Sequence, residues 1–323
     1  GINAEYGEQA MSQQTIVIAL GGNAMQQPGQ LGSHENQLEN VNIACNEIFK
    51  VRQAGYRVVL TSGNGPQVGA IKLQNQAAAG VSPEMPLFCC GAMSQGLIGY
   101  WMQQSMGNVL RQHNEEAKVC TVVTQTIVDK NDKAFQNPTK PVGRFYTEAE
   151  AKEVMEKEHK VMKEDAGRGY RVVVPSPRPV NIVEYKIIKQ LIESGILVIC
   201  TNGGGIPVIQ EGNQVQGVDA VIDKDLATSL LATELESDYL MILTDVTNAC
   251  LNYKQPNEEK LGTIKLERML ALEKEGHFKA GSMGPKVRAA IEFVEKTGKP
   301  AIITCLDKAV DALEGKCGTR IVM

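Results

Sequence analysis

Short apolar runs that alternate with helix-like segments constrain the fold of this chain more than any other feature. β-Branched residues dominate six runs that we expect to form strands, at 15–20, 57–61, 119–123, 196–200, 239–243 and 301–304. Between strands, 38–54, 223–235 and 285–297 place apolar residues close to every 3.6 positions, which predicts amphipathic helices. Strands alternating with helices favour right-handed crossovers. We therefore predict a three-layer α/β/α sandwich with a mainly parallel central sheet.

Residues 126–180 interrupt this alternation. The segment is rich in proline, lysine, aspartate and arginine, and it contains a capping box in which Thr147 precedes Glu150 by three positions. Glu–Lys pairs four residues apart follow at 148/152, 153/157 and 156/160, and they are typical of a solvent-exposed helix. We predict that 126–180 projects from an α/β domain of residues 15–323 as a small lid-like subdomain. The alternative is a surface excursion without a function.

Composition excludes several classes of function. The chain has 323 residues, of which 43% are hydrophobic, and a net charge of −4. This balance predicts a soluble globular protein without a basic surface for nucleic acid or an anionic membrane. No apolar run approaches the ~20 residues that span a bilayer. The chain opens with Gly1, and Met11 stands just before the first predicted strand, so we expect residues 1–14 to be a tag or a disordered tail.

The cysteine pattern indicates a reducing compartment. None of the eight cysteines forms a C-x-x-C pair, and several lie in apolar runs, such as Cys120 and Cys200. A disulfide framework or a zinc site would show different spacing. We therefore predict reduced, buried thiols and a cytoplasmic protein.

Glycine and asparagine follow three of the predicted strands, at 21–23, 62–64 and 202–205. Ligands of open α/β sheets bind outside the carboxyl ends of the strands, where glycine lets backbone N–H groups approach an anion. Three such loops favour a convergent polar site over ordinary turns. Neither the dinucleotide fingerprint G-x-G-x-x-G nor the P-loop G-x-x-x-x-G-K-[ST] occurs at these places. Any phosphate must therefore be held by another arrangement.

Two lysines occupy the first turns of predicted helices. Lys224 lies between Asp223 and Asp225 at the start of 223–235, and Lys286 follows Pro285, which would be a good first helical residue. A cation there opposes the helix dipole by about 0.3–1 kcal/mol, so stability alone favours an acidic residue. We expect both lysines to reach a bound anion; the alternative is that they are exposed and solvated. Lys140, near two prolines in the predicted lid, is a weaker third candidate.

The four histidines lie outside the glycine loops and the lysine turns, and no G-x-S-x-G or H-E-x-x-H motif occurs. A reaction that needs a histidine base is therefore not expected. Phosphoryl transfer to an acceptor that is already ionised needs no such base. It needs positioning and cationic stabilisation of the transferred group.

These residues carry a resemblance to the carbamate kinases of the amino acid kinase superfamily. The matching strings include ALGGNA (19–24), SGNGPQVG (62–69), NPTKPVG (137–143), VVPSPRP (173–179), GGGIPV (203–208), AVIDKD (220–225) and GHFKAGSMGPK (276–286). The resemblance implies reversible phosphoryl transfer between ATP and carbamate, giving ADP and carbamoyl phosphate, usually toward ATP at the end of arginine catabolism. It also implies a homodimer and Mg²⁺ carried by ATP or ADP rather than by protein side chains.

The resemblance assigns a role to each matching residue. The residues expected to hold carbamate and the transferred phosphoryl group are Gly21, Gly22, Asn23, Ser62, Gly63 and Asn64. Those expected to line the nucleotide are Asn202, Gly203, Gly204, Gly205, Thr244, Asp245, Ala249, Tyr253, Met283 and Gly284. The catalytic set would be Lys140, Lys224 and Lys286, with Asp223 and Asp225 orienting the lysines and the water shell of the metal.

Position 62 departs from the family pattern, because many bacterial members carry histidine where this chain has Ser62. The neighbouring glycines and Asn64 still match, so we expect the departure to adjust the site without changing the class of reaction. Cys250 would lie close to the nucleotide and is a candidate for thiol-reactive inhibition, although a passive buried cysteine is the simpler reading.

Two other functions stay open on the sequence alone. One is a sister kinase acting on an amino acid carboxylate such as acetylglutamate, against which NPTKPVG argues. The other is a non-catalytic nucleotide-binding protein, against which the lysines argue, because a binder need not stabilise a transition state.

Overall fold

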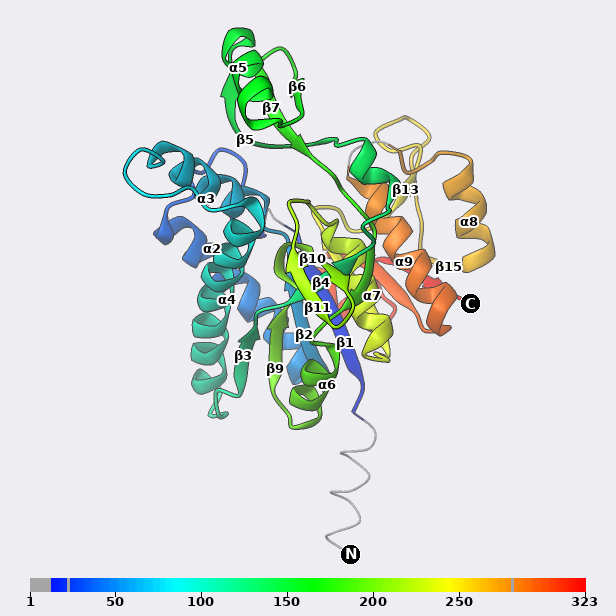
Figure 1. The fold of residues 1–323 in the computed structure, drawn as a ribbon. Helices are drawn as coiled ribbons and strands as arrows, with labels where there is room; N and C mark the ends of the chain where they lie inside the picture. The colour runs from blue at the N-terminus through cyan, green and yellow to red at the C-terminus, as the bar shows by residue number, and fades with distance from the viewer. Residues whose placement is uncertain (1–12, 22–23, 280–281) are drawn as a thin grey trace, which may run out of the picture.

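A computed structural model describes residues 13–21, 24–279 and 282–323. Its centre is an eight-stranded sheet in the order β15-β17-β16-β12-β1-β2-β9-β3 (Figure 1). Every neighbouring pair is parallel except β16 and β17. The strands are β1 (Thr15–Leu20), β2 (Arg57–Ser62), β3 (Val119–Val122), β9 (Leu197–Cys200), β12 (Tyr239–Thr244), β15 (Thr263–Lys265), β16 (Ala301–Cys305) and β17 (Thr319–Val322). The predicted fold class is confirmed, and the six expected strands agree within one residue at each end.

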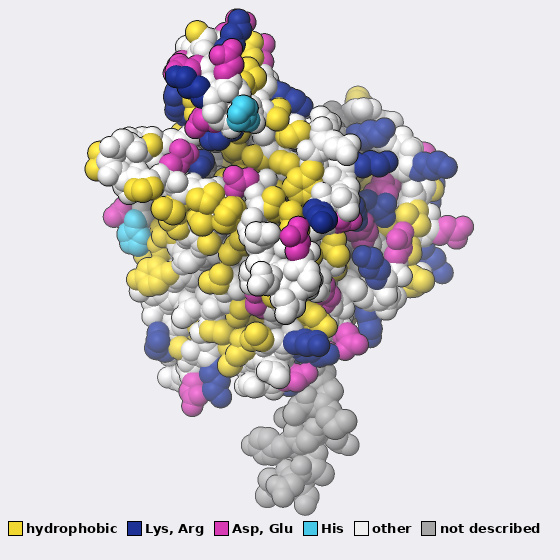
Figure 2. Space-filling view, viewed as in Figure 1, with side chains coloured by type: hydrophobic (Ala, Val, Ile, Leu, Met, Phe, Trp, Pro, Cys, Tyr) yellow, Lys and Arg dark blue, Asp and Glu magenta, His cyan; other side chains and the backbone are white. Residues whose placement is uncertain are grey.

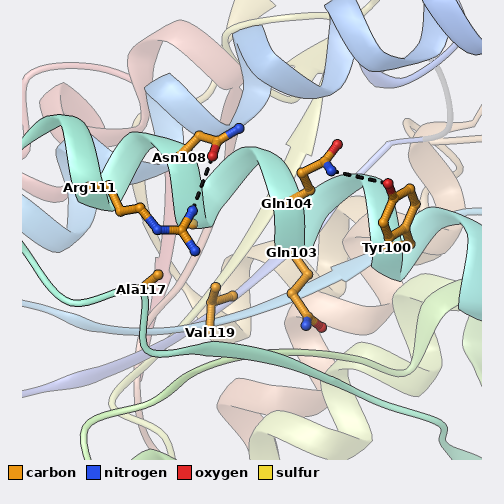
Figure 3. Close-up of a pocket in the computed structure, with 8 residues that line it drawn as sticks. Tyr100, Gln103, Gln104, Asn108, Arg111, Ala117 and Val119 are labelled. Atoms are coloured by element: carbon orange, nitrogen blue, oxygen red, sulfur yellow. Dashed lines mark hydrogen bonds between the residues drawn. The ribbon is translucent and has the colours of Figure 1, made fainter.

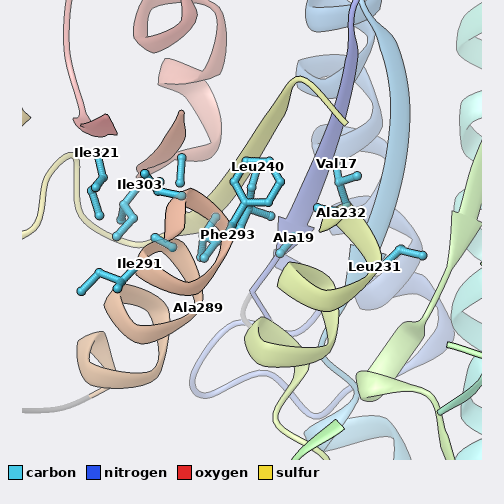
Figure 4. Close-up of a cluster of buried hydrophobic side chains, with 14 of the residues drawn as sticks. Val17, Ala19, Leu231, Ala232, Leu240, Ala289, Ile291, Phe293, Ile303 and Ile321 are labelled. Atoms are coloured by element: carbon cyan, nitrogen blue, oxygen red, sulfur yellow. The ribbon is translucent and has the colours of Figure 1, made fainter. Parts of the chain in front are cut away.

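The central sheet is buried on both faces, as its apolar strands require. Successive residues of a strand point to opposite faces. Val17 and Ala19 of β1 therefore join one hydrophobic cluster, part of which Figure 4 shows. Ile16 and Ile18 join a second cluster on the opposite face. Two separate cores on one sheet give the three layers.

Helices supply the outer layers. The second cluster packs under α2 (His34–Gln53), α4 (Leu87–Gln112) and α10 (Ala309–Leu313). The first packs under α6 (Tyr185–Glu193), α7 (Lys224–Glu234), α8 (Leu266–Lys274) and α9 (Met283–Thr297). The expectation for Pro285 was wrong in detail, because α9 begins at Met283 and Pro285 is its third residue. The missing N–H of proline is harmless there too, since the first four N–H groups of a helix have no intrahelical partner.

Two smaller sheets, of four and three strands, accompany the central one. The first has the order β11-β10-β4-β8, and the second, β5-β7-β6, projects from the body together with α5 (Figure 1). Their elements are β4 (Gln125–Val128), β8 (Pro179–Ile182), β10 (Ile206–Glu211), β11 (Gln214–Gly217), β5 (Lys140–Tyr146), β6 (Met162–Glu164), β7 (Tyr170–Val174) and α5 (Glu148–Glu158). The projecting unit thus spans 140–174, because the ends of 126–180 form β4 and β8, which lie in the four-stranded sheet.

The helix of the projecting subdomain begins as its sequence indicates. Thr147 and Glu150 make both hydrogen bonds of the capping box. Of the three Glu–Lys spacings, the one at Glu153 and Lys157 forms an ion pair, 2.5 Å long. Lys160 instead lies 3.9 Å from Glu158. Exposed pairs of this kind add little stability, so the cap is the stronger local determinant.

The remaining elements connect these layers. They are α3 (Gly65–Ala77), β13 (Cys250–Leu251), β14 (Glu259–Lys260) and the 3₁₀ helices η2 (Lys133–Gln136), η3 (Asn202–Gly204) and η4 (Leu306–Lys308). All eight cysteines carry free thiols, of which four are buried. Within the part of the chain that the structure describes, no helix is long and apolar enough to cross a membrane.

Candidate active site

The carboxyl ends of β1, β2 and β9 meet at one edge of the sheet, because these strands are parallel neighbours. Two contacts tie the ends together. The Gly63 N–H donates to the carbonyl of Leu20 (3.2 Å), and the buried Ser62 hydroxyl donates to Oδ1 of Asn202 (3.0 Å). The expected contributions of Gly22 and Asn23 lie outside the described residues. The other two predicted loops are therefore adjacent.

The three consecutive glycines adopt a conformation that other residues strongly disfavour. Gly203, Gly204 and Gly205 have φ of +68°, +88° and +89°. A Cβ at Gly203 would lie 2.3 Å from the Asn64 side chain, and one at Gly205 would lie 2.0 Å from Oγ1 of Thr126. Glycine is thus required by backbone geometry and by close packing of neighbouring elements.

The backbone hydrogen bonds of this turn give the three glycines a different role from the one predicted. The sequence suggested that they present backbone N–H groups to phosphate. The N–H of Gly204 instead donates to the carbonyl of Thr201 (3.0 Å), and that of Gly205 to the carbonyl of Asn202 (3.3 Å). Two of the three N–H groups are therefore used to close the turn itself.

A glutamine that sequence reasoning missed supports this turn. Gln95 of α4 is 1% exposed, and its amide accepts from the Thr124 N–H (2.9 Å) and donates to the carbonyls of Thr124 (3.0 Å) and Asn202 (3.3 Å). Thr124 in turn accepts the N–H of Thr201, which is strained at φ +56°. A single glutamine within a helix carries no sequence signal for such a role.

Two of the predicted lysines meet at one carboxylate. Lys224 Nζ lies 2.8 Å from Oδ1 of Asp225, and Lys286 Nζ lies 3.5 Å from Oδ2 of the same side chain. Asp225 is 3% exposed. A cavity of about 540 Å³ adjoins this cluster. Five described residues of the predicted site line it, namely Gly21, Lys224, Thr244, Asp245 and Lys286. Around Asp225 two cations face one carboxylate, so positive charge is in local excess there and suits an anionic ligand. Asp245, which also lines the cavity, accepts from the Thr244 hydroxyl instead (3.1 Å).

Asp223 makes a different contact from its neighbour. Its side chain caps α7 by accepting the N–H of Leu226 (2.9 Å). The cap satisfies a donor that the first turn leaves unpaired. Asp225, not Asp223, contacts the two lysines. Asp223 instead fixes the start of α7, the helix from which Lys224 extends.

A second cavity, of about 170 Å³, shares Thr244, Asp245 and Ser282 with the first. The other residues that line it include Cys250, Tyr253, His277, Phe278 and Met283. Three of these were expected near the nucleoside or the nucleotide, whereas His277 and Phe278 were missed. Burial raises the pKa of the Cys250 thiol, which disfavours the reactive thiolate.

Two residues expected beside the nucleoside do not line this cavity. Ala249 is fully buried, and its N–H donates to Oγ1 of Thr319 (2.9 Å). Gly284 is the second residue of α9, where a Cβ would lie 3.0 Å from the carbonyl oxygen of Phe278. Neither residue lines the two adjoining cavities.

A third cavity, of about 220 Å³, lies between the subdomain and the body. Asn64, Gly203 and Gly205 line it from the body, and Lys140 and Arg171 line it from the subdomain. Lys140 is exposed. Asn64 is held by a hydrogen bond from its Nδ2 to Oγ of Ser94 (3.0 Å). The predicted residues that line a cavity thus fall into three hollows rather than one.

A further cavity, of about 340 Å³, contains none of the predicted site residues (Figure 3). It lies between α4 and the start of β3, where Arg111 donates to Asn108 (3.1 Å) and Gln104 donates to Tyr100 (3.1 Å). Because it borders the amino end of β3, it lies away from the strand ends that form the candidate site.

Comparisons with known proteins identify the lineage. The family model described as "Amino acid kinase family" matches residues 14–305. A carbamate kinase of Giardia intestinalis is 67% identical over 310 residues, covering 95% of this chain and 98% of the relative. A carbamate kinase of Pyrococcus furiosus is 54% identical, with the same coverage.

Solved structures agree. A carbamate kinase from Giardia lamblia bound to AMP-PNP superposes with a TM-score of 0.94 at 68% identity, covering 96% of this chain and 99% of that one. Another structure of the Giardia lamblia enzyme, thiocarbamoylated by disulfiram on a cysteine, gives 0.92 at 67% with the same coverage. The chain therefore belongs to the amino acid kinase family and, within it, to the carbamate kinases.

Proposed function

We propose that this protein catalyses reversible phosphoryl transfer between ATP and carbamate. The observation that carries the proposal is the Lys224–Asp225–Lys286 cluster beside Gly21 and Thr244, at the strand ends of a carbamate kinase fold. Relatives named carbamate kinase, 67% and 54% identical over nearly the whole chain, support the same substrate.

The reaction needs little covalent help from the protein. Toward ATP, a β-phosphate oxygen of ADP attacks the phosphorus of carbamoyl phosphate, the bond from phosphorus to the carbamoyl oxygen breaks, and carbamate leaves with that electron pair. Attacking and leaving oxygens are both ionised, so no proton has to move. The two lysines would stabilise the charge on the equatorial oxygens of the transferred group.

We assign a subsite to each of the three cavities. The nucleotide phosphates would lie in the 540 Å³ cavity with Lys224 and Lys286, and the nucleoside in the adjoining hollow near Tyr253. Carbamate or carbamoyl phosphate would enter beside Asn64, beneath Lys140. The AMP-PNP complex of the Giardia lamblia relative supports a nucleotide site.

We propose that Mg²⁺ arrives on the nucleotide. Across the described ranges, no three acidic, histidine or cysteine side chains gather into a metal-binding cluster. Both oxygens of Asp225 contact lysines, and one oxygen of Asp223 caps α7. Because these carboxylate oxygens already have partners, we expect the ion to be held by phosphate oxygens and water, which Mg²⁺ usually prefers. The ion would neutralise charge on the phosphates.

One assay separates this function from its rivals. Purified protein with MgADP and carbamoyl phosphate should form ATP, as measured by a luciferase-coupled assay. Turnover of acetylglutamate with MgATP in place of carbamate would instead support a sister kinase. ADP binding without either turnover would support a non-catalytic nucleotide-binding protein. The cytoplasmic location and the role at the end of arginine catabolism stay predictions from the sequence.

We also propose that the protein is a homodimer, as the resemblance implies. β3 is one of the two edge strands of the central sheet, so a second copy could continue the sheet there. Hydrophobic side chains gather on the face below the subdomain (Figure 2), and exposed ones near this edge include Leu97, Tyr100 and Val123. Light scattering should report a dimer that Tyr100→Glu weakens; a monomer at all concentrations would contradict the proposal.

A further inference from the structure

The strand that carries Lys140 has an interruption in its pairing. β5 pairs with β7 from Lys140 to Val142, and pairing resumes only at Tyr146. Such irregularities leave backbone groups without ladder partners and re-aim the neighbouring side chains. The peptide between Gly143 and Arg144 lies inside this gap, so its carbonyl and its N–H must be satisfied in another way.

Two side chains satisfy that peptide from opposite sides. The Arg144 N–H donates to Oε1 of Gln76 (3.1 Å), and the Gly143 carbonyl accepts from Nε of Arg171 (3.2 Å). Arg171 belongs to β7 of the subdomain, whereas Gln76 belongs to α3 of the body. The Gln76 bond therefore joins the subdomain to the body.

The Gln76 side chain packs tightly against β5. Its Nε2 donates to the Tyr146 hydroxyl at 3.5 Å. Gly143 has φ +77°, and a Cβ there would lie 3.0 Å from both Oε1 and Nε2 of Gln76. Glycine thus lets the amide lie directly against the backbone of β5.

The position of Gln76 links this contact to the candidate site. It lies in the last turn of α3, and α3 begins directly after Asn64. Lys140 lies three residues before Gly143 on β5 and lines the same cavity as Asn64 and Gly203. We propose that Gln76 is a positioning residue, which holds β5 so that Lys140 stands over the acceptor cavity. This rests on the proposed function, because it takes Lys140 to act on the phosphoryl group.

The kinetic test compares Gln76→Met with Gln74→Met. Methionine keeps the length of the side chain but removes its polar atoms, and Gln74 is an exposed glutamine of the same helix. With MgADP, Gln76→Met should lower kcat/KM for carbamoyl phosphate roughly fivefold to tenfold, the scale of one lost hydrogen bond. Gln76→Glu, which keeps the acceptor atom, should restore most of it. Gln74→Met should stay at the wild-type value.

A double-mutant cycle asks whether the effect passes through Lys140. In a Lys140→Ala background, Gln76→Met should cause no further loss. An equal loss in both backgrounds, or no loss in the wild-type background, would overturn the inference. Absence of ATP from the wild-type protein would instead contradict the proposed function.

Hydrogen exchange gives a test independent of turnover. The Arg144 amide should exchange faster in Gln76→Met than in the wild type or in Gln74→Met, because its acceptor is lost. The melting temperature should fall by no more than about 2–4 °C, the scale of one lost hydrogen bond. Unchanged exchange at Arg144 would overturn the inference whatever the activity of the variants.

Discussion

Replacing Asp225 with asparagine tests the charge arrangement at the centre of the candidate site. At an effective dielectric constant of about 20, unit charges separated as Asp225 is from Lys224 and Lys286 attract by about 5–6 kcal/mol each. Desolvation cancels much of this attraction, and breaking a buried pair typically costs about 3–5 kcal/mol. The three side chains are only 4%, 15% and 10% exposed, so this range applies.

We expect Asp225→Asn to lower the free energy of unfolding by about 3 kcal/mol. The lower end is chosen because the amide keeps one acceptor oxygen and the lysines border a cavity. Urea unfolding monitored by circular dichroism measures the change. Asp245→Asn is the control, since Asp245 is exposed and contacts Thr244 rather than a lysine, and it should change stability by less than about 0.5 kcal/mol. Equal stabilities of the two variants would refute the reasoning.

Three further predictions concern other parts of the fold. Gly205→Ala should destabilise the protein by about 2 kcal/mol or more in urea unfolding, because its Cβ would overlap Thr126; Gly212→Ala, with φ +62° and open space around it, should cost only about 1 kcal/mol, and equal costs would contradict the packing argument. Burial raises the pKa of Glu234 to about 7, so the protonated form stabilises the fold below about pH 4.5 and this contribution is lost as the pH rises through 7. The free energy of unfolding of Glu234→Gln should therefore rise relative to that of the wild type between about pH 4.5 and 7. Parallel curves of the free energy of unfolding against pH would contradict this. Alkylation of Cys250, followed by mass spectrometry, should be slow because burial raises its pKa, and MgADP should slow it further; labelling unaffected by MgADP would place the nucleotide elsewhere.

The sequence predicts the scaffold well where one physical rule decides the outcome. β1 is a short uninterrupted apolar run rich in β-branched residues, which favours a strand buried on both faces, and Ile16 and Val17 are both buried. The N-terminus of α5 is equally clear, because Thr147 and Glu150 satisfy each other's backbone donors. Such signals are local, so no tertiary information is needed to read them.

Features that depend on distant contacts could not be predicted. Helix α4 was not identified, although it spans 26 residues, because Pro86 offers no side-chain cap and glycines interrupt its pattern. Gly99 is one of them, and a Cβ there would lie 2.3 Å from Cγ2 of Thr121 on β3. The close approach of helix and strand that explains this glycine is visible only in the fold.

The candidate site likewise has some features with local sequence signals and others that depend on distant contacts. Lys224 and Lys286 stand out in the sequence because they oppose the helix dipoles. The sequence does not show that both lysines contact Asp225, because they belong to different helices and lie 62 residues apart in the chain. Gln76 and Gln95 have no sequence signal, because their partners are backbone groups of other segments.

ATP formation by the wild type and by Lys286→Ala tests the central claim most directly. Each protein is incubated with MgADP and carbamoyl phosphate, with Lys274→Ala on the surface of α8 as the control for loss of a lysine. We predict that the wild type and the control form ATP equally well and that Lys286→Ala is about 10²–10³-fold slower, as for removal of one electrostatic donor at a transition state. Equal rates for all three proteins, or no ATP from the folded wild type, would contradict the account.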